Sequence, residues 1–278
     1  MHTQTPSQTY APLRNAFAAR VLAALAVAAC AHGSPARAGE LVQLATRTGV
    51  TQRVFVSAPA APPPWIAVLF AGDDGNVALS SGGPARMQGN FVVRTASYWV
   101  DHGEGSAIFD APSDNADGMR DDFRLGADAS TDVAQVVAEL RRRYPGARIA
   151  LVGTSRGTIT VGNLIKRRPD LADAFVMTSP VTQESRGQPG LSGMAWDGNK
   201  ARVLVVSNEH DGCQVSPFDS ARQLAAKNGF DFIAVASSQG GGDRKSDCKA
   251  QSPHGFLGIE QTVLDDIRGW LDKAPAPR

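Results

Sequence analysis

The segment from Gly153 to Gly157 (Gly-Thr-Ser-Arg-Gly) matches the pattern G-x-S-x-G, with Ser155 at its centre. A short apolar run, Ile149 to Val152, precedes the pattern and is typical of a buried strand. A segment with approximate helical spacing follows it. A serine between two such elements lies on a tight strand-to-helix turn, where side chains two residues away would collide with neighbouring backbone. The pattern predicts that the Ser155 hydroxyl is presented as a nucleophile.

A serine hydroxyl needs a histidine to take its proton and a carboxylate to orient that histidine. After a turn of this kind, the acid is expected next in the chain and the histidine last, each beyond a strand of the sheet. The apolar run Val203 to Val206 leads into a loop that holds Asp211, which we choose as the acid. Glu209 is a nearby competitor, and Asp219 is expected to cap the next helix.

The choice of base is narrower, because the chain has five histidines and only His254 follows Asp211. It lies in the loop Ser252 to Phe256, directly before the last predicted helix. The order Ser155, Asp211, His254 therefore predicts a catalytic triad.

An oxyanion formed during attack by Ser155 needs two N–H donors. One is expected from the residue after the nucleophile, Arg156, and the other from the loop after the strand Trp65 to Phe70. In that loop we choose the N–H of Asp73, with Gly72 as the alternate.

The two cysteines outside the N-terminal region, Cys213 and Cys248, are expected to pair if the chain is exported. A closed loop of about 35 residues would stabilise the fold by ~3–4 kcal/mol in the chain-entropy model. The bridge would also tie the loop of the acid to the loop of the histidine. We expect no metal site, because neither cysteine has a C-x-x-C partner.

Strand-like and helix-like segments alternate along the chain. The run Trp65 to Phe70 is apolar throughout, which indicates a strand buried on both faces. The alternation predicts an α/β fold with a mostly parallel central sheet and helices on both faces. The remaining expected elements are strands at 41–45, 52–57, 107–109, 174–177, 202–206 and 230–235, and helices at 131–144, 219–228 and 259–271.

Between Trp65 and Leu271 the chain resembles the α/β-hydrolase superfamily, with Gly153 to Gly157 as its nucleophile elbow. It is similar to small exported bacterial serine hydrolases without an assigned substrate, and the segments Gly89 to Arg94 and Phe109 to Asp114 look like that group's sequence. The resemblance implies an α/β-hydrolase fold. A lid often occupies the region before the strand at 202–206. Here that region is short and rich in Gly, Ser and Pro, so we expect little or no lid.

The N-terminal 38 residues have the pattern of a signal peptide. Arg14 and Arg20 precede the apolar stretch Val21 to Ala31, which is shorter than the ~20 residues that a membrane span needs. Ala36-Arg37-Ala38 offers a cleavage site, leaving residues 39–278 as one catalytic domain of a periplasmic or secreted protein. Alternatively, Val27 to Cys30 resembles a lipobox, and Cys30 would then anchor a lipoprotein.

The net charge of +1 gives no electrostatic case for a nucleic-acid partner. We expect a carboxylic-ester hydrolase that works through an acyl-enzyme, needs no cofactor and acts on small-molecule or polymer-borne esters. The alternatives are a peptidase or amidase with the same triad, and a non-catalytic binding protein on a hydrolase fold.

Two further groups of charged residues lie outside the predicted triad. The aspartates at 110, 114, 117, 121 and 122 do not have the spacing of a calcium loop, so we expect them to form a solvated loop. Arg94 and Arg156 are candidates to meet near the site and select an acidic or carbonyl-rich substrate.

Overall fold

The computed structural model describes residues 1–2 and 39–273. The chain divides into two units, Met1–Gly33 and Ser34–Arg278, and all described helices and strands belong to the second. Residues 3–38 of the predicted signal peptide, with Cys30 and the Ala36-Arg37-Ala38 cleavage site, lie outside the described residues.

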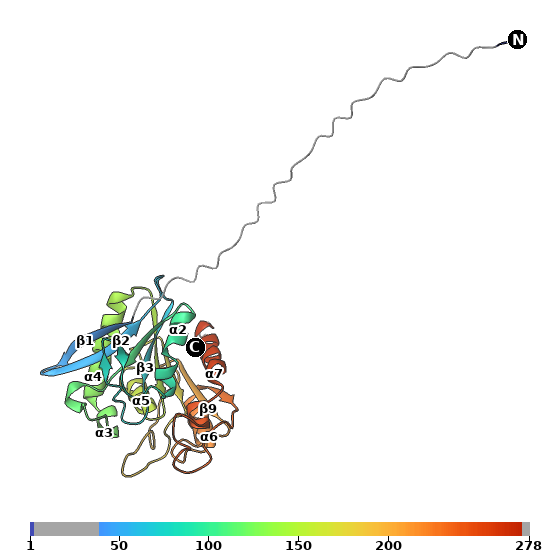
Figure 1. Cartoon of the computed structure of the whole chain (residues 1–278). Helices are drawn as coiled ribbons and strands as arrows, with labels where there is room; N and C mark the ends of the chain where they lie inside the picture. Colours follow the sequence, from blue (N-terminus) through green and yellow to red (C-terminus); the bar gives the residue numbers. More distant parts are fainter. Residues whose placement is uncertain (3–38, 274–278) are drawn as a thin grey trace. The chain divides into compact units, whose positions relative to one another are not determined.

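An eight-stranded sheet with the order β1-β2-β6-β3-β7-β8-β9-β10 forms the centre of this unit (Figure 1). The parallel part of the sheet consists of β6, β3, β7, β8, β9 and β10. Strand β2 pairs in antiparallel fashion with both β1 and β6. The strands of the sheet are β1 (Glu40–Arg47), β2 (Val50–Ser57), β3 (Trp65–Phe70), β6 (Gly105–Phe109), β7 (Arg148–Thr154), β8 (Ala174–Thr178), β9 (Val203–Asn208) and β10 (Asp231–Val235). A separate small hairpin consists of β4 (Leu79–Ser80) and β5 (Gly83–Pro84).

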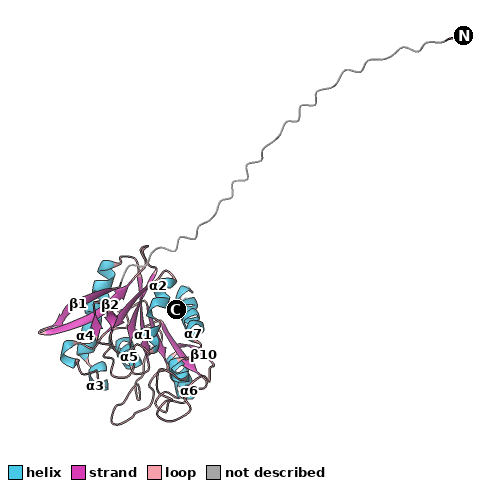
Figure 2. Cartoon of the chain, viewed as in Figure 1, coloured by secondary structure: helices cyan, strands magenta, loops and turns pink. Residues whose placement is uncertain are grey.

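Helices cover both faces of the sheet (Figure 2). Buried side chains of α4, α5 and α6 pack on one face, and those of α1, α2 and α7 pack on the other. The helices are α1 (Phe91–Arg94), α2 (Ala96–Asp101), α3 (Asp121–Arg124), α4 (Ala127–Arg143), α5 (Gly157–Arg167), α6 (Phe218–Asn228) and α7 (Glu260–Asp272), with 3-10 turns η1 (Ser113–Asn115) and η2 (Pro253–Gly255).

Strand β3 shows why a continuous apolar run belongs at the centre of such a sheet. All six of its residues are buried. Successive side chains of a strand point to opposite faces, and Ile66, Val68 and Phe70 accordingly enter one core while Trp65, Ala67 and Leu69 enter the other. This confirms the predicted α/β fold with a mostly parallel sheet and helices on both faces.

The segment that follows β8 contains no helix between residues 179 and 202. Its backbone instead turns back on itself, with the N–H of Leu191 donating to the carbonyl of Val181 at 2.8 Å. This agrees with the prediction of little or no lid.

The prediction of a solvated acidic loop is wrong for two of its aspartates. Asp110 and Asp121 are buried. Asp110 accepts hydrogen bonds from the backbone N–H groups of Val77 (2.9 Å), in the loop after β3, and of Leu79 (2.8 Å), the first residue of β4. Asp114 pairs with Arg47 at 2.8 Å. The spacing of these aspartates could not predict their hydrogen-bond and ion-pair partners, because each partner belongs to a distant segment of the chain.

Candidate active site

Ser155 lies on the turn between β7 and α5, with a backbone φ of 51°. This left-handed conformation is uncommon for a residue with a side chain and is found at functional sites. The glycines on either side make the turn possible. A Cβ on Gly157 would lie 2.1 Å from the carbonyl oxygen of Phe70, and one on Gly153 would lie 2.6 Å from the carbonyl oxygen of Gly157. Both positions therefore require glycine.

His254 lies in η2, and its ring contacts both other members of the predicted triad. Its Nε2 is 2.9 Å from Ser155 Oγ and its Nδ1 is 2.9 Å from Asp211 Oδ2. With its proton on Nδ1, the neutral imidazole donates to Asp211 and accepts the hydroxyl proton of Ser155. The structure thus brings together three residues that lie 43 to 99 positions apart in the chain.

The carboxylate of Asp211 is fully buried, in the turn after β9. The two other acids considered from the sequence lie elsewhere. Glu209 is exposed, and Asp219 lies in the first turn of α6, where it pairs with Arg222 at 2.9 Å. Among the described residues, neither carboxylate forms a hydrogen bond or ion pair with His254.

Asn208, which sequence reasoning missed, connects the two loops that carry the acid and the base. It is the last residue of β9 and is fully buried. Its side-chain amide donates to the carbonyl of Pro253 (3.1 Å), next to His254, and its Oδ1 accepts from the N–H of His210 (3.0 Å). The only feature of the sequence that could have indicated this role is the position of Asn208, just beyond a predicted strand and close to Asp211.

The proposed oxyanion donors lie around the nucleophile. Asp73 and Arg156 line the same cavity as Ser155, whereas Gly72 does not. The backbone N–H groups of Arg156 and Asp73 make no hydrogen bond within the described part of the chain. A Cβ on Gly72 would lie 2.9 Å from Ser155 Cβ, so this glycine allows the loop to approach the nucleophile closely.

The side chain of Arg156 turns away from the nucleophile and forms an ion pair with the buried carboxylate of Asp121. It also donates to Gln188 Oε1 at 3.1 Å. Asp121 in turn accepts from the N–H of Gly190 at 2.9 Å. This network joins α3 and the segment after β8 to the residue that follows the nucleophile.

Arg124, also in α3, is fully buried without a carboxylate in hydrogen-bond contact. It donates to the carbonyl of Asp73 (3.2 Å) and to Thr160 Oγ1 (3.3 Å). Burial, together with the positive charge of Arg156, lowers the pKa of Arg124 to about 10. Helix α3 therefore holds both chain segments that are expected to supply oxyanion donors.

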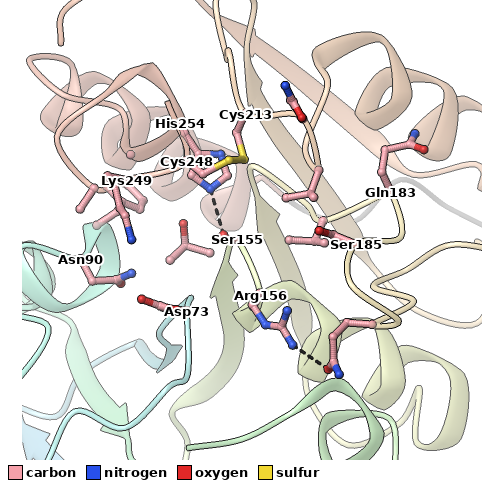
Figure 3. A pocket seen from close by; sticks show the side chains of 18 of the residues that line it. Asp73, Asn90, Ser155, Arg156, Gln183, Ser185, Cys213, Cys248, Lys249 and His254 are labelled. Atoms are coloured by element: carbon pink, nitrogen blue, oxygen red, sulfur yellow. Dashed lines mark hydrogen bonds between the residues drawn. A yellow bond between two sulfur atoms is a disulfide. The ribbon is translucent and has the colours of Figure 1, made fainter. Parts of the chain in front are cut away.

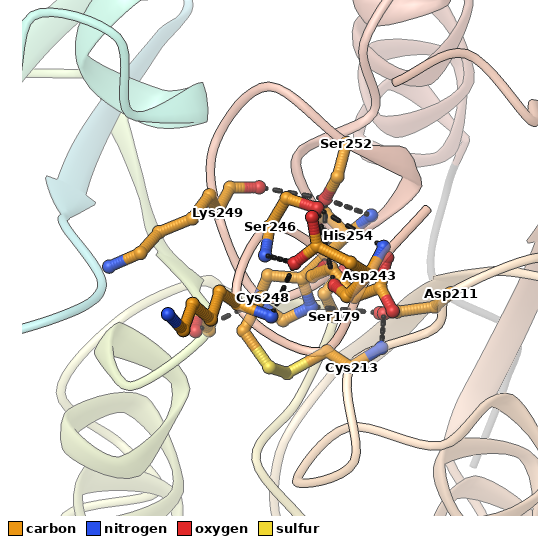
Figure 4. Close-up of a disulfide and its surroundings, with 12 residues drawn as sticks. Ser179, Asp211, Cys213, Asp243, Ser246, Cys248, Lys249, Ser252 and His254 are labelled. Atoms are coloured by element: carbon orange, nitrogen blue, oxygen red, sulfur yellow. Dashed lines mark hydrogen bonds and ion pairs between the residues drawn. A yellow bond between two sulfur atoms is a disulfide. The ribbon is translucent and has the colours of Figure 1, made fainter. Parts of the chain in front are cut away.

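Cys213 and Cys248 form a disulfide, as expected from the sequence, with their Cα atoms 4.6 Å apart (Figure 4). The N–H of Cys213 donates to Asp211 Oδ1 at 2.9 Å. Asp211, Cys213 and His254 also form the one group of three possible metal ligands found among the described residues. Because the sulfur of Cys213 is bonded to Cys248, it is not available as a thiolate ligand.

A cavity of about 610 Å³ lies over Ser155 and His254 (Figure 3). In Figure 3, Lys249, Asn90 and Asp73 lie on one side of Ser155, and Gln183 and Ser185 lie on the other. Arg94, a candidate for substrate selection, is not among the lining residues. It pairs with Glu260 at 2.8 Å and donates to the carbonyl of Gly255 at 2.6 Å.

Within the described residues, no helix combines the length and the apolar character needed to cross a bilayer. No protein-family model matches the sequence, and no curated protein is significantly similar to it.

Solved structures, in contrast, match the fold. An α/β serine hydrolase homologue from Coxiella burnetii is 17% identical with a TM-score of 0.55, and the match covers 84% of this chain and 96% of that one. A serine hydrolase without a lid from Xanthomonas campestris is 15% identical with a TM-score of 0.55, covering 85% and 97%. The acylaminoacyl peptidase of Pyrococcus horikoshii is 12% identical with a TM-score of 0.58, covering 87% of this chain and 43% of that one. At these identities the likeness concerns the fold: the chain has the fold of the α/β serine hydrolases.

Proposed function

We propose that the protein is an exported serine hydrolase that cleaves carboxylic esters. The observation that supports this most directly is the continuous hydrogen-bond chain from Asp211 through His254 to Ser155, which ends in an accessible cavity. A surface serine has no such partners, and the geometry is the one that general-base activation of a hydroxyl needs.

In the proposed reaction, Ser155 Oγ attacks the ester carbonyl while its proton passes to His254 Nε2. The buried carboxylate of Asp211 stabilises the imidazolium that results. The N–H groups of Arg156 and Asp73 stabilise the oxyanion of the tetrahedral intermediate. His254 then gives its proton to the leaving alcohol, and the acyl group stays on Ser155. Water, activated by His254, releases the acid and restores the serine. These steps require no cofactor.

The test is hydrolysis of p-nitrophenyl acetate and butyrate by residues 39–278, compared with the Ser155→Ala variant. Loss of a triad member lowers kcat by ~10⁴-fold or more, far above assay error. Equal rates in the two proteins would reject catalysis by Ser155 and favour a binding protein on a hydrolase fold. Labelling of Ser155 with a fluorophosphonate checks the nucleophile independently of any substrate.

A peptidase or amidase is the second candidate, since the fold is shared with an acylaminoacyl peptidase. The same triad can cleave amides, and the pocket decides the leaving group. A matched panel of p-nitrophenyl esters and p-nitroanilides with the same acyl groups separates the two activities. A kcat/KM for the anilides as high as that for the esters would favour the peptidase.

We further propose that the protein acts in the periplasm or outside the cell, after cleavage behind Ala38. The Cys213–Cys248 disulfide supports this, because disulfides persist in oxidising compartments. The mass of the intact protein isolated from its natural location tests the proposal. A chain that begins at Gly39 agrees with it, and a lipidated chain that begins at Cys30 identifies a lipoprotein instead.

A further inference from the structure

The cavity over Ser155 has three cationic side chains at its edge: Arg186, Arg244 and Lys249. They come from two loops, one after β8 and one before η2. All three are exposed, and none of their side chains makes an ion pair or hydrogen bond within the described part of the chain. In Figure 3 Lys249 lies on the same side of Ser155 as Asn90.

The carboxylates that flank Arg244 and Lys249 in the chain are engaged within their own loop. Glu184, two residues before Arg186, is exposed and does not line the cavity. Asp243 Oδ1 accepts from the N–H groups of Lys245 (2.7 Å) and Ser246 (3.0 Å). Asp247 Oδ1 accepts from the N–H of Gly242 at 2.8 Å. Neither aspartate lines the cavity. Their hydrogen bonds shape the loop and leave Arg244 and Lys249 without a counter-ion.

The other charged residues of the cavity do not cancel this excess. Arg156 and Asp121 neutralise each other in their ion pair. Asp73 is the one lining carboxylate with no side-chain partner among the described residues, against three unpaired cations. The edge of the cavity therefore has a net positive charge, although the chain as a whole has a net charge of only +1.

The backbone at Arg186 provides a second observation. Its φ of 53° and the φ of 69° at Gly187 place two successive residues in the left-handed region, between Ser185 and Gln188, which bridge each other. Turns of this type favour asparagine or glycine at both central positions. An arginine costs about 1 kcal/mol more here, and its side chain makes no hydrogen bond or ion pair among the described residues.

Asn90 adds a polar side chain to the wall of the cavity. Its side chain lines the cavity, and its buried Oδ1 has no hydrogen-bond partner. A buried amide oxygen without a partner is costly. Because this oxygen is also inaccessible to solvent, a molecule bound in the cavity does not reach it in this conformation.

From these contacts we propose that the substrate is an ester that carries an anionic group in addition to the bond that is cleaved. The cations Arg186, Arg244 and Lys249 bind this group at the edge of the cavity. This specificity rests on the proposed ester hydrolysis at Ser155. The proposed substrate class is therefore an ester of an acidic molecule or polymer, and a neutral lipid is not expected to be the substrate.

The test compares anionic esters with neutral esters of the same shape. The anion lies in the acyl part of the hemiglutarate of 4-methylumbelliferone, whose neutral counterpart is the methyl-capped diester. It lies in the alcohol part of 4-acetoxybenzoate, whose neutral counterpart is methyl 4-acetoxybenzoate. The readout is the ratio of kcat/KM for the anionic ester to that for the neutral ester. The pair with the larger ratio identifies the side of the ester that carries the charge.

The ratio is measured for the unmodified protein and for the double variant Arg244→Gln, Lys249→Gln. Because both proteins are assayed with the same substrates, the intrinsic reactivity of the esters cancels. An exposed ion pair contributes up to about fivefold, so we expect the ratio to fall about tenfold in the double variant. Raising the ionic strength to about 0.5 M should lower the ratio of the unmodified protein in the same direction.

Lys245→Gln is the matched control, since Lys245 is exposed in the same loop but does not line the cavity. Its ratio should stay within about twofold of the unmodified protein, as expected for an exposed charge away from the ligand. The specificity proposal is overturned if the double variant keeps the ratio, or if Lys245→Gln lowers it equally. Failure of the proposed function is a different result: no ester of either kind would then be hydrolysed in a way that depends on Ser155.

Discussion

The backbone N–H of Cys213 donates a 2.9 Å hydrogen bond to the same carboxylate, that of Asp211, which holds the ring of His254. The disulfide to Cys248 thus fixes one of the hydrogen bonds that orient the acid. It also connects the loop of Asp211 with the loop of His254, which lies six residues beyond Cys248. A covalent bond near the surface is in this way coupled to the geometry of the candidate triad.

We expect the double variant Cys213→Ser, Cys248→Ser to lose stability and activity together. Opening a loop with a sequence separation of 35 residues lowers the free energy of unfolding by about 3–4 kcal/mol in the chain-entropy model. Greater freedom of Asp211 should lower kcat about tenfold, because misplaced catalytic groups are costly. Urea unfolding and steady-state kinetics measure the two effects. A variant with unchanged kcat would show that the bridge supports the fold without orienting the triad.

Replacing Arg124 by methionine should lower kcat about tenfold or more. The carbonyl of Asp73 then loses the hydrogen-bond donor that holds its loop, and this loop is expected to supply one of the two N–H groups that stabilise the oxyanion. The free energy of unfolding should change little. Methionine fills a similar space, and the variant no longer buries a charge, whose burial already lowers the pKa of Arg124 to about 10.

Arg120→Met is the matched control for this variant. Arg120 precedes α3, and its side chain is 72% exposed, so its loss should leave kcat unchanged. Equal rates in the Arg124 and Arg120 variants would mean that the loop of Asp73 keeps its conformation without Arg124.

Replacement by alanine should lower the stability of the protein at Gly157 and raise it at Gly269. A Cβ at Gly157 would lie 2.1 Å from the carbonyl oxygen of Phe70, so Gly157→Ala should destabilise the protein by about 3 kcal/mol or more. A Cβ at Gly269, inside α7, meets nothing within 4 Å, and Gly269→Ala should stabilise it by about 0.5–1 kcal/mol. Denaturant midpoints measure both. A stable Gly157→Ala protein would contradict the close contact between the turn and β3.

Glu139 contributes a pH-dependent part of the stability. Hydrogen bonds from Arg142 and Arg143 lower the pKa of its carboxyl group to about 2. A carboxylate with a lowered pKa in the folded state stabilises the fold above its ordinary pKa and loses this effect as the pH falls toward the lowered value.

The Glu139→Gln variant should therefore unfold about 2–4 °C below the unmodified protein at pH 7, as expected for a loss of about 1 kcal/mol. The difference in Tm should shrink as the pH falls from about 4.5 to about 2. A difference that stayed constant over this range would show that the ion pairs of Glu139 do not stabilise the fold.

Much of the fold and the order of the candidate triad could be read from the sequence, because these features are local. The run Trp65 to Phe70 is a strand with the predicted bounds, since six consecutive apolar residues are typical of a strand buried on both faces. The glycines around Ser155 predicted the turn, and a single histidine after Asp211 left one choice of base. The short helices α1, α2 and α3 were not predicted, because four to six residues are too few to show a helical period.

Only the tertiary structure decided which polar residues support the site. Asp121, expected in solvent, is buried against Arg156. Arg94, expected to select the substrate, is bound to Glu260, while Arg244 and Lys249 reach the cavity instead. The physical reason is that an ionic side chain takes its role from partners supplied by other strands and loops. The sequence alone therefore determined the sheet, the nucleophile turn and the pair of cysteines, whereas folding decided which charges are neutralised and which remain free to bind a ligand.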